Sequence, residues 1–118
     1  MSPSIEITYD SVDDKFLKKL HDLIEENISE PELEVDMIVK KIGMSRAQLY
    51  RKLNALTGQS VKEFVRNARL RTAARLLEKG DLRIIEVMNM VGISNRSYFI
   101  KCFKEMFGVS PSEYRKTA

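Results

Sequence analysis

The stretch IGMSRAQLYRKLNALTGQSVKEF, residues 42–64, recurs in altered form as VGISNRSYFIKCFKEMFGVSPSEY, residues 91–114. A shift of 50 positions pairs Gly58 with Gly108, and the shift falls to 49 upstream, so the second copy carries one extra residue just after Ser94. Each copy has the pattern of a short helix, a turn that holds glycine and a capped second helix. The duplication therefore predicts two helix-turn-helix units in one chain.

Hydroxyl side chains mark the starts of the predicted helices. In three places a serine precedes a glutamate or glutamine by three positions, which is the spacing of a capping box. The three pairs are Ser45 with Gln48, Ser60 with Glu63, and Ser110 with Glu113. Ser94 is predicted to start the second helix of the second copy, and Pro31 is predicted to stop the helix that begins after Ser11.

These signals predict an all-α fold of about seven helices, with two helix-turn-helix subdomains joined by a long central helix. No strand-like alternation continues beyond residue 10. The predicted helices span residues 12–28, 35–42, 46–57, 61–79, 83–91, 95–107 and 111–117. The predicted parts are a linker or arm at 1–10, a first subdomain at 11–59, the connecting helix at 60–80 and a second subdomain at 81–118.

Charge is divided unevenly along the chain. The 118 residues carry a formal net charge of +3, but ten acidic residues and three lysines give residues 1–34 a net −7, and residues 35–118 carry +10. A compact segment of this charge attracts polyanions, nucleic acid before an anionic membrane. Charge alone also allows a basic surface kept for solubility. The acidic segment either docks on the basic part and holds it off DNA, or is a linker with one amphipathic helix packed away from DNA.

On a helical wheel, the second helix of each copy has an apolar stripe and a polar outer face. The stripes are Leu49, Leu53 and Leu56 in the first copy and Phe99, Phe103 and Met106 in the second. Arg46 and Arg96 fall in the first turns, from which a recognition helix contacts base edges. Tyr50 and Ile100 flank the stripes, where they either cover the edge of the core or contact thymine methyl groups.

The predicted roles of the outer side chains follow from their chemistry. Arginine and lysine bind guanine edges or nearby acceptors, which we expect of Arg46, Arg51, Arg96 and Lys101. Phosphate contacts are predicted for Ser45, Gln48, Asn54, Ser94, Asn95 and Lys104, with helix N-termini at Ser45 and Ser94. A central helix of residues 61–79 is about 28 Å long, close to the roughly 34 Å between successive major grooves. For any single side chain the alternative is an ordinary solvated surface residue.

The second copy contains a sequence signature made of Ile84, Glu86, Val87, Val91, Gly92, Ile93, Ser97, Tyr98, Phe99, Phe103, Lys104, Gly108, Val109, Ser110, Pro111, Tyr114 and Arg115. This signature resembles the C-terminal signature of the AraC/XylS transcription regulators, and the resemblance covers about residues 12–117. Ile93 replaces the phenylalanine that is usual in that family. The resemblance implies that base edges face Arg46, Ala47, Tyr50, Arg51, Arg96, Ser97 and Lys101.

A second group of residues lies around the first copy: Ser11, Val12, Asp13, Phe16, Leu17, the run Gly43 to Arg46, the run Leu49 to Leu53, and the run Leu56 to Ser60. This group is similar to the subgroup that ends hybrid two-component sensors of gut Bacteroides-like bacteria. The resemblance implies an activator at the output end of a much longer membrane sensor, often one that controls carbohydrate-use genes. Its implied partners are double-stranded DNA, the upstream sensor and receiver domains of the same polypeptide, and RNA polymerase.

The composition argues against other classes of function. One cysteine, Cys102, and one histidine, His21, cannot supply a disulfide or a Cys/His zinc site. No apolar run reaches the roughly 20 residues that span a bilayer, and the N-terminus does not resemble a signal peptide. We therefore expect a cytoplasmic regulator that binds double-stranded DNA and has no catalytic residue, metal, cofactor or membrane contact. The competing function is an α-helical protein-interaction module that docks acidic partners.

Overall fold

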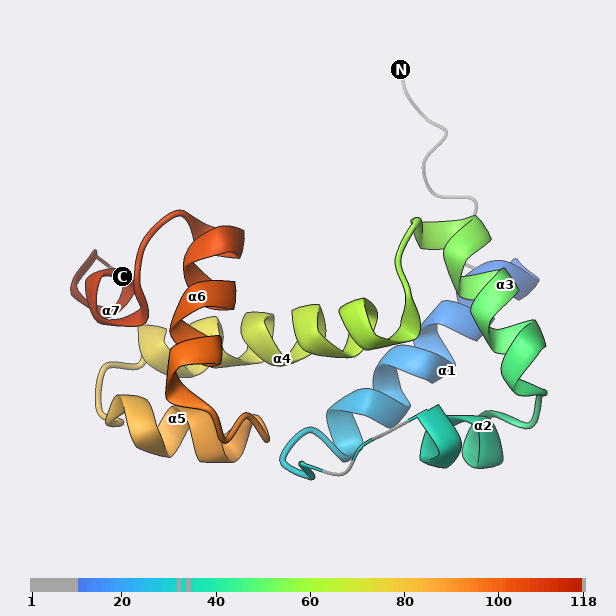
Figure 1. The fold of residues 1–118 in the computed structure, drawn as a ribbon, viewed down its shortest axis with the longest axis horizontal. Coiled ribbons are helices and arrows are strands. Elements are labelled where there is room, and N and C mark those ends of the chain that lie inside the picture. The colour runs from blue at the N-terminus through green and yellow to red at the C-terminus, as the bar shows by residue number, and fades with distance from the viewer. Residues whose placement is uncertain (1–10, 32, 34, 118) are drawn as a thin grey trace, which may run out of the picture.

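Seven helices make up the described part of the chain. The computed structural model describes residues 11–31, 33 and 35–117, and the arm predicted at residues 1–10 lies outside the described residues. The helices are α1 (Val12–Glu26), α2 (Val35–Ile42), α3 (Arg46–Thr57), α4 (Val61–Glu78), α5 (Ile84–Met90), α6 (Arg96–Phe107) and α7 (Pro111–Thr117) (Figure 1). The described residues form no strand, and the predicted all-α fold with a long central helix is confirmed.

All three predicted capping boxes are present. Ser45 Oγ accepts a hydrogen bond from the Gln48 backbone N–H at 3.1 Å, and Gln48 Oε1 accepts one from the Ser45 N–H at 2.9 Å. The serine–glutamate pairs at the starts of α4 and α7 make the same two bonds. The backbone N–H that each carboxylate accepts lowers the pKa of Glu63 and of Glu113 below the ordinary value. Two N–H groups that a helix start leaves unpaired are thus satisfied at each place.

The predicted start of α6 is wrong by one residue. Asn95, not Ser94, is the N-cap, and its Oδ1 accepts a hydrogen bond from the Tyr98 N–H at 2.9 Å. Asn95 is the extra residue of the second copy, so the insertion itself supplies the cap and moves Ser94 one position away from the helix.

The predicted end of α1 at residue 28 is also wrong. The helix ends at Glu26, and the C-cap is Asn27, whose side-chain Nδ2 donates a hydrogen bond to the Leu23 carbonyl at 2.8 Å. The side chain thereby pairs one of the last carbonyls of the helix, which have no intrahelical partner. Pro31 lies five residues beyond the helix and is not what stops it.

Two apolar cores form, and α4 contributes to both. The first core contains Phe16, Leu20, Ile24, Leu33, Ile38, Ile42, Leu49, Leu53, Val61, Val65 and Ala68. The second core contains Leu70, Ala73, Ala74, Leu77, Ile84, Val87, Met88, Val91, Ile93, Phe99, Cys102 and Phe103. Burying a leucine or phenylalanine side chain is worth about 1.5–3 kcal/mol, so each half of the molecule holds its own helices together.

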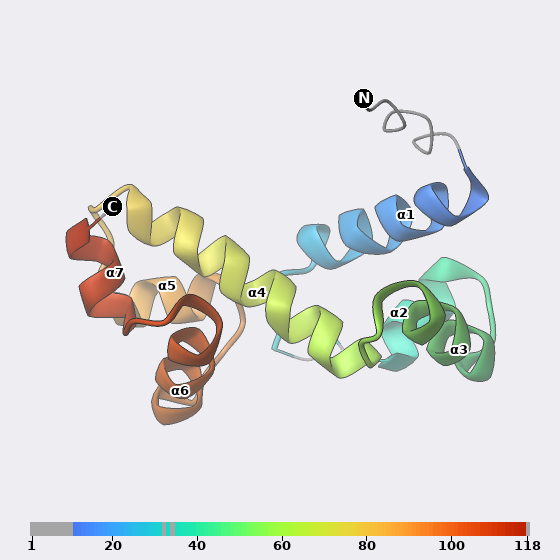
Figure 2. The ribbon, with the colours of Figure 1, turned by 90° about the horizontal axis from the view of Figure 1, so that it is seen from above.

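The second helix of each helix-turn-helix unit lies at one end of α4. In Figure 1, α3 and α6 both run from the lower to the upper part of the view, at opposite ends of the central helix. Figure 2 shows that α3 and α6 lie on the same side of the molecule, and that α1 lies on the other side. The molecule measures 41 × 39 × 21 Å along its principal axes. One broad face therefore carries both helices in the same direction.

Candidate nucleic-acid interface

Every side chain to which the sequence assigns a base-edge or phosphate contact is exposed. The thirteen residues are Ser45, Arg46, Ala47, Gln48, Tyr50, Arg51, Asn54, Ser94, Asn95, Arg96, Ser97, Lys101 and Lys104. Below them the predicted core stripes are closed, since Leu49, Leu53, Phe99 and Phe103 are 0% exposed. Each second helix therefore buries one side and leaves the other free for a ligand, although the division into base and phosphate contacts stays a prediction.

Arg46, at the start of α3, is held by two neighbours. It forms an ion pair with Asp36 of α2, and its Nη1 donates a hydrogen bond to Tyr50 Oη at 3.3 Å. The hydrogen bond to Tyr50, followed by the charge of Asp36, raises the pKa of Arg46 above its ordinary value. This role of Asp36 could not be predicted from the sequence, because a pairing across ten residues and two helices leaves no spacing signal.

The opposite side of α3 is braced by α1. Lys52 Nζ lies 4.9 Å from the centroid of the Phe16 ring and 3.7 Å from Asp13 Oδ1. A cation over an aromatic face is attracted to the ring, so Lys52 contributes to packing. Arg51, the residue before Lys52 in α3, is exposed. The two adjacent cations of α3 thus have different surroundings: Lys52 packs on α1, and Arg51 stays accessible to a ligand.

The second unit has no counterpart of the contacts that hold Arg46 to Asp36 and Tyr50. Shifts of 49 and 50 place Ile85 and Ile100 where the first copy has Asp36 and Tyr50. Within the described part of the chain, Arg96 forms no ion pair. Ile100 is partly buried and packs at the edge of the second core, and its contact with a thymine methyl group stays a prediction. Tyr50 is 44% exposed and bonds Arg46, so it covers no core.

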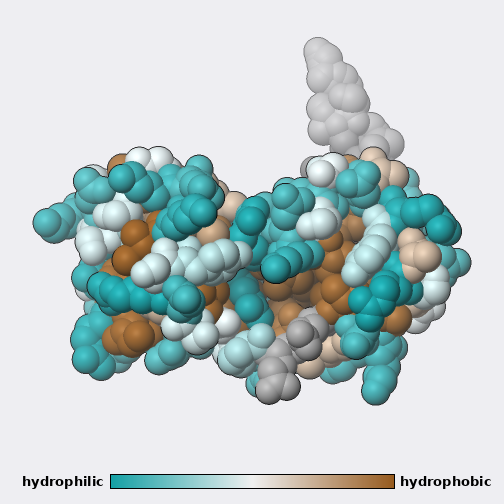
Figure 3. Space-filling model, in the orientation of Figure 1, coloured by the Kyte–Doolittle hydropathy of each residue, from teal (hydrophilic) through white to brown (hydrophobic). Residues whose placement is uncertain are grey.

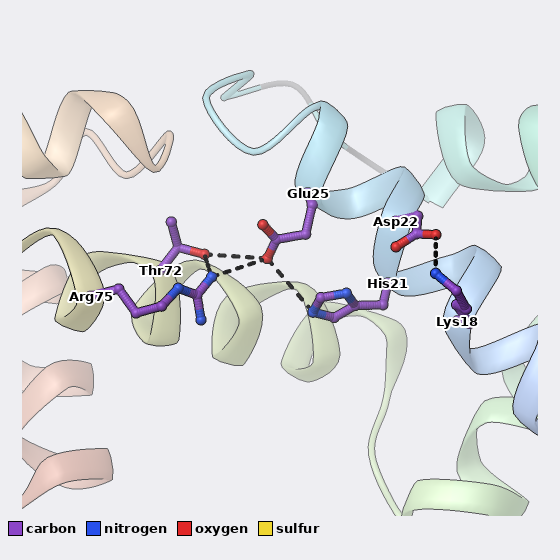
Figure 4. Close-up of polar contacts among 6 residues, drawn as sticks. All are labelled: Lys18, His21, Asp22, Glu25, Thr72 and Arg75. Atoms are coloured by element: carbon purple, nitrogen blue, oxygen red, sulfur yellow. Dashed lines mark hydrogen bonds and ion pairs between the residues drawn. The ribbon is translucent and has the colours of Figure 1, made fainter. Parts of the chain in front are cut away.

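The acidic helix α1 lies away from the outer faces of α3 and α6. Figure 4 shows Glu25 of α1 facing α4, where its Oε2 accepts a hydrogen bond from Thr72 Oγ1 at 3.3 Å and lies 3.5 Å from Arg75 Nη2. His21 Nε2 lies 3.6 Å from the same carboxylate oxygen. For α1, the structure therefore fits the amphipathic helix packed away from DNA. Docking by residues 1–10 lies outside the described residues and stays a prediction.

A hollow with an apolar floor lies between the two halves. It has a volume of about 470 Å³, and its lining residues are Leu33, Val35, Val61, Val65, Ile93, Lys62, Arg66, Arg69 and Tyr98. Figure 3 shows polar residues around the rim of the face that carries α3 and α6, with apolar surface in the middle of this face and in patches over the half that carries α6. Three cations of α4 at this hollow, Lys62, Arg66 and Arg69, are not among the predicted site residues. The spacing of four between Lys62 and Arg66, which puts both on one helix face, is the signal that could have found them.

The described residues offer little for other chemistry. They contain no group of three or more His, Cys, Asp or Glu side chains that could hold a metal ion. Among the described helices, none combines the length and the apolar character that crossing a membrane requires. Cys102 is buried in the second core, where it packs as a small apolar side chain.

Comparison with known proteins decides the family. The helix-turn-helix domain family matches residues 38–117. A solved transcriptional regulator from Chromobacterium violaceum, described as an AraC-type DNA-binding domain-containing protein, is 28% identical with a TM-score of 0.80 over 86% of this chain and 90% of that one. This chain belongs to the AraC-type helix-turn-helix family. The predicted resemblance is therefore confirmed.

Two further relatives of this AraC-type domain bear on its function. The DNA-binding domain of AdpA, a global transcriptional factor solved in complex with a target DNA, is 27% identical with a TM-score of 0.76, over 86% of this chain and 90% of that one. Histidine kinase P4 of Formosa agariphila is 36% identical over 115 residues, which is 98% of this chain. The chain spans only 8% of the length of that kinase.

Proposed function

We propose that this chain is a sequence-specific, double-stranded DNA-binding transcription regulator that inserts α3 and α6 into two successive major grooves. The observation that carries the proposal is the placement of two exposed second helices, running in the same direction, on one side of α4. The 18 residues of α4 span about 27 Å. Successive major grooves on one face of B-form DNA are roughly 34 Å apart, a spacing that fits within the 41 Å length of the molecule.

The two kinds of contact have separate roles in this proposal. Phosphate contacts position the protein, and base contacts specify the sequence. The capped N-termini of α3 and α6 direct backbone N–H groups and a partial positive charge toward phosphates, together with the side chains of Ser45 and Asn95. Arg51, Arg96 and Lys101 reach base acceptors, and Arg46 does so after it leaves Asp36.

The wider context of the domain is also a proposal. Because a histidine kinase contains a closely similar segment, we propose that this chain acts as the output domain of a two-component sensor, with upstream sensor and receiver domains of the same polypeptide as partners. A cytoplasmic location is part of the same proposal, because the domain would act where the DNA lies. It acts by binding, without catalysis, and contact with RNA polymerase and activation stay predictions.

Selection from a pool of random duplexes at fixed salt tests the function directly. We expect an enriched motif with two half-sites about one helical turn apart, and an affinity that falls steeply as salt rises because bound cations release counterions. Recovery of no motif, with equal weak binding to every duplex, would contradict sequence-specific binding. Failure to bind duplex DNA at all, with binding to acidic proteins instead, would favour the protein-interaction module.

A further inference from the structure

Arg69 lies at the boundary between the two cores. Its neighbour Ala68 packs in the first core and its neighbour Leu70 in the second. The guanidinium reaches sideways from α4 to two backbone carbonyls: Nη2 donates to Glu30 O at 2.6 Å, and Nη1 donates to Gly92 O at 3.2 Å. Glu30 follows α1, and Gly92 lies in the turn of the second helix-turn-helix unit. One side chain thus bridges the loop of one half and the turn of the other.

Gly92 completes this bridge because the two segments touch through their backbones. Its φ is +75°, and a Cβ added there would lie 2.8 Å from Ile28 O and 3.2 Å from the Arg69 guanidinium carbon. Real Cβ atoms do not approach a carbonyl oxygen that closely. Only glycine therefore lets the turn before α6 sit directly against the loop after α1.

Apart from the contacts made by α4, few helix contacts connect the two halves. Each extensive contact between described helices either stays within one half or involves α4: none of α1, α2 and α3 packs extensively on α5, α6 or α7. Two bodies attached to one helix can still twist about it. The contact of Glu30 and Ile28 with Arg69 and Gly92 joins the two halves outside α4, and Ile28 packs against both cores, so this region opposes such a twist.

The chemistry of Arg69 fits a geometric role. Burial lowers the pKa of its guanidinium below the ordinary value, and its Nε is buried without a hydrogen-bond partner among the described residues. Its hydrogen-bond acceptors among the described residues are the Glu30 and Gly92 carbonyls. Among the described residues, no carboxylate forms an ion pair with this half-buried cation, and a buried charge without a partner is a costly way to add stability. The planar guanidinium is, however, the side chain that can bond two acceptors in fixed directions at once.

We propose that Arg69 and Gly92 form a clamp between the two halves, which fixes the spacing and direction of α3 relative to α6. Arg69 is a positioning residue in this proposal, and its effect on DNA rests on the proposed function. When the clamp is lost, only a fraction of molecules presents both helices at the groove spacing. The apparent affinity for a two-half-site duplex falls in proportion to that fraction, whereas the affinity for a single half-site is unchanged.

The test on DNA uses duplexes whose half-site spacing is the selected one or differs from it by one or two base pairs. For Arg69→Met, we expect about tenfold weaker binding at the best spacing if a tenth of the molecules stays competent, and a flatter dependence on spacing than in the wild type. Arg71→Met is the matched control, because Arg71 is exposed on the same helix and loses the same charge. It should leave the spacing dependence unchanged.

Arg69→Lys separates the clamp from a simple phosphate contact. A lysine keeps the charge but lacks the planar guanidinium that bonds two carbonyls at once, so we expect the flat spacing dependence to persist. Two results would overturn the clamp: an equal loss at every spacing in Arg69→Met, or full recovery in Arg69→Lys. Both would show that the charge of Arg69 acts on DNA directly.

A second measurement needs no DNA and so remains decisive if the proposed function fails. Spin labels at Ala55→Cys and Glu105→Cys, two exposed sites on α3 and α6, are placed in a Cys102→Ala background. Pulsed distance measurements should give a narrow distribution in the parent protein and with Arg71→Met, and a broader one with Arg69→Met. The same narrow distribution in all three, with the far-ultraviolet circular dichroism unchanged, would refute the clamp.

Discussion

Asp36 of α2 and Arg46 of α3, ten residues apart in the chain, form an ion pair on the face that carries the proposed DNA contacts. The Arg46 side chain is about half exposed, at 51%, and Asp36 is 84% exposed, so both remain within reach of a ligand. The two helix-turn-helix units therefore differ in a way that matters for binding. In the proposed function, Arg46 of the first unit exchanges the Asp36 carboxylate for DNA, whereas Arg96 of the second unit binds without such an exchange.

Asp36→Asn should strengthen DNA binding. The substitution removes the anion that competes with DNA for Arg46 and that repels phosphates, and exposed ion pairs of this kind are weak, so we expect a rise of about two- to fivefold. Fluorescence anisotropy with the selected duplex measures it. Asp22→Asn is the control, because it frees Lys18 from a similar pair on α1, on the other side of the molecule. An equal gain from both variants would mean that only net charge matters.

Arg51→Ala and Lys104→Ala should differ in kind. A bidentate contact to a base is worth about 1–3 kcal/mol against the wrong base, so Arg51→Ala should relax the preference at one base pair of the first half-site. Lys104→Ala should weaken binding to matched and scrambled duplexes alike and reduce the salt dependence by about one counterion. Competition titrations with single-base variants of the motif measure both effects. Equal losses on matched and scrambled duplexes for both variants would remove the base-reading role of Arg51.

Gly92→Ala should destabilise the fold more than Gly108→Ala does. Both glycines have a positive φ, which costs alanine about 1–2 kcal/mol, but nothing lies within 4 Å of a Cβ at Gly108. At Gly92 the Cβ also overlaps Ile28 O, and such overpacking adds about 1–3 kcal/mol. Urea unfolding followed by circular dichroism compares the two. Equal losses would show that the turn moves away from Ile28 at no cost.

Asn95→Ala should lower the free energy of unfolding by about 1 kcal/mol, because it removes the side chain that caps α6. Ser94→Ala should change it by less than about 0.5 kcal/mol, since Ser94 is exposed and caps nothing. Thermal melting of both variants measures the difference. If Ser94→Ala proved the more costly change, the cap would lie at Ser94 after all.

Local chemistry explains why much of this fold could be predicted. Ser45 and Gln48 signal a helix start through their own backbone contacts, and Leu49 and Leu53 signal a buried side through spacing alone. The start of α6 was misplaced because the second copy gained Asn95, which competes with Ser94 as a cap. The change of offset between the two repeats shows that the second copy has one additional residue. It does not show which of the two possible capping residues, Ser94 or Asn95, caps the helix.

Contacts between distant segments left no trace in the sequence. Arg69 and Gly92 lie 23 positions apart, and Glu30 lies 39 positions from Arg69. Arg69 also looks like any other basic residue of α4, a helix whose charges recur around its circumference. Its separate role depends on two backbone carbonyls that only the folded arrangement brings to it.

The division of α4 between two apolar cores has a consequence for how the molecule melts. Val61 and Val65 are buried in the first core, and Ala73 and Leu77 are buried in the second core. Cooperativity between the halves depends on the continuity of a single helix and a few bridging groups. A substitution that leaves a cavity in the first core, such as Leu49→Ala, should unfold the N-terminal half of α4 at a temperature at which its C-terminal half stays folded. Calorimetry would then resolve two heat-absorption peaks, and the protein would pass through a state with one working DNA-binding unit.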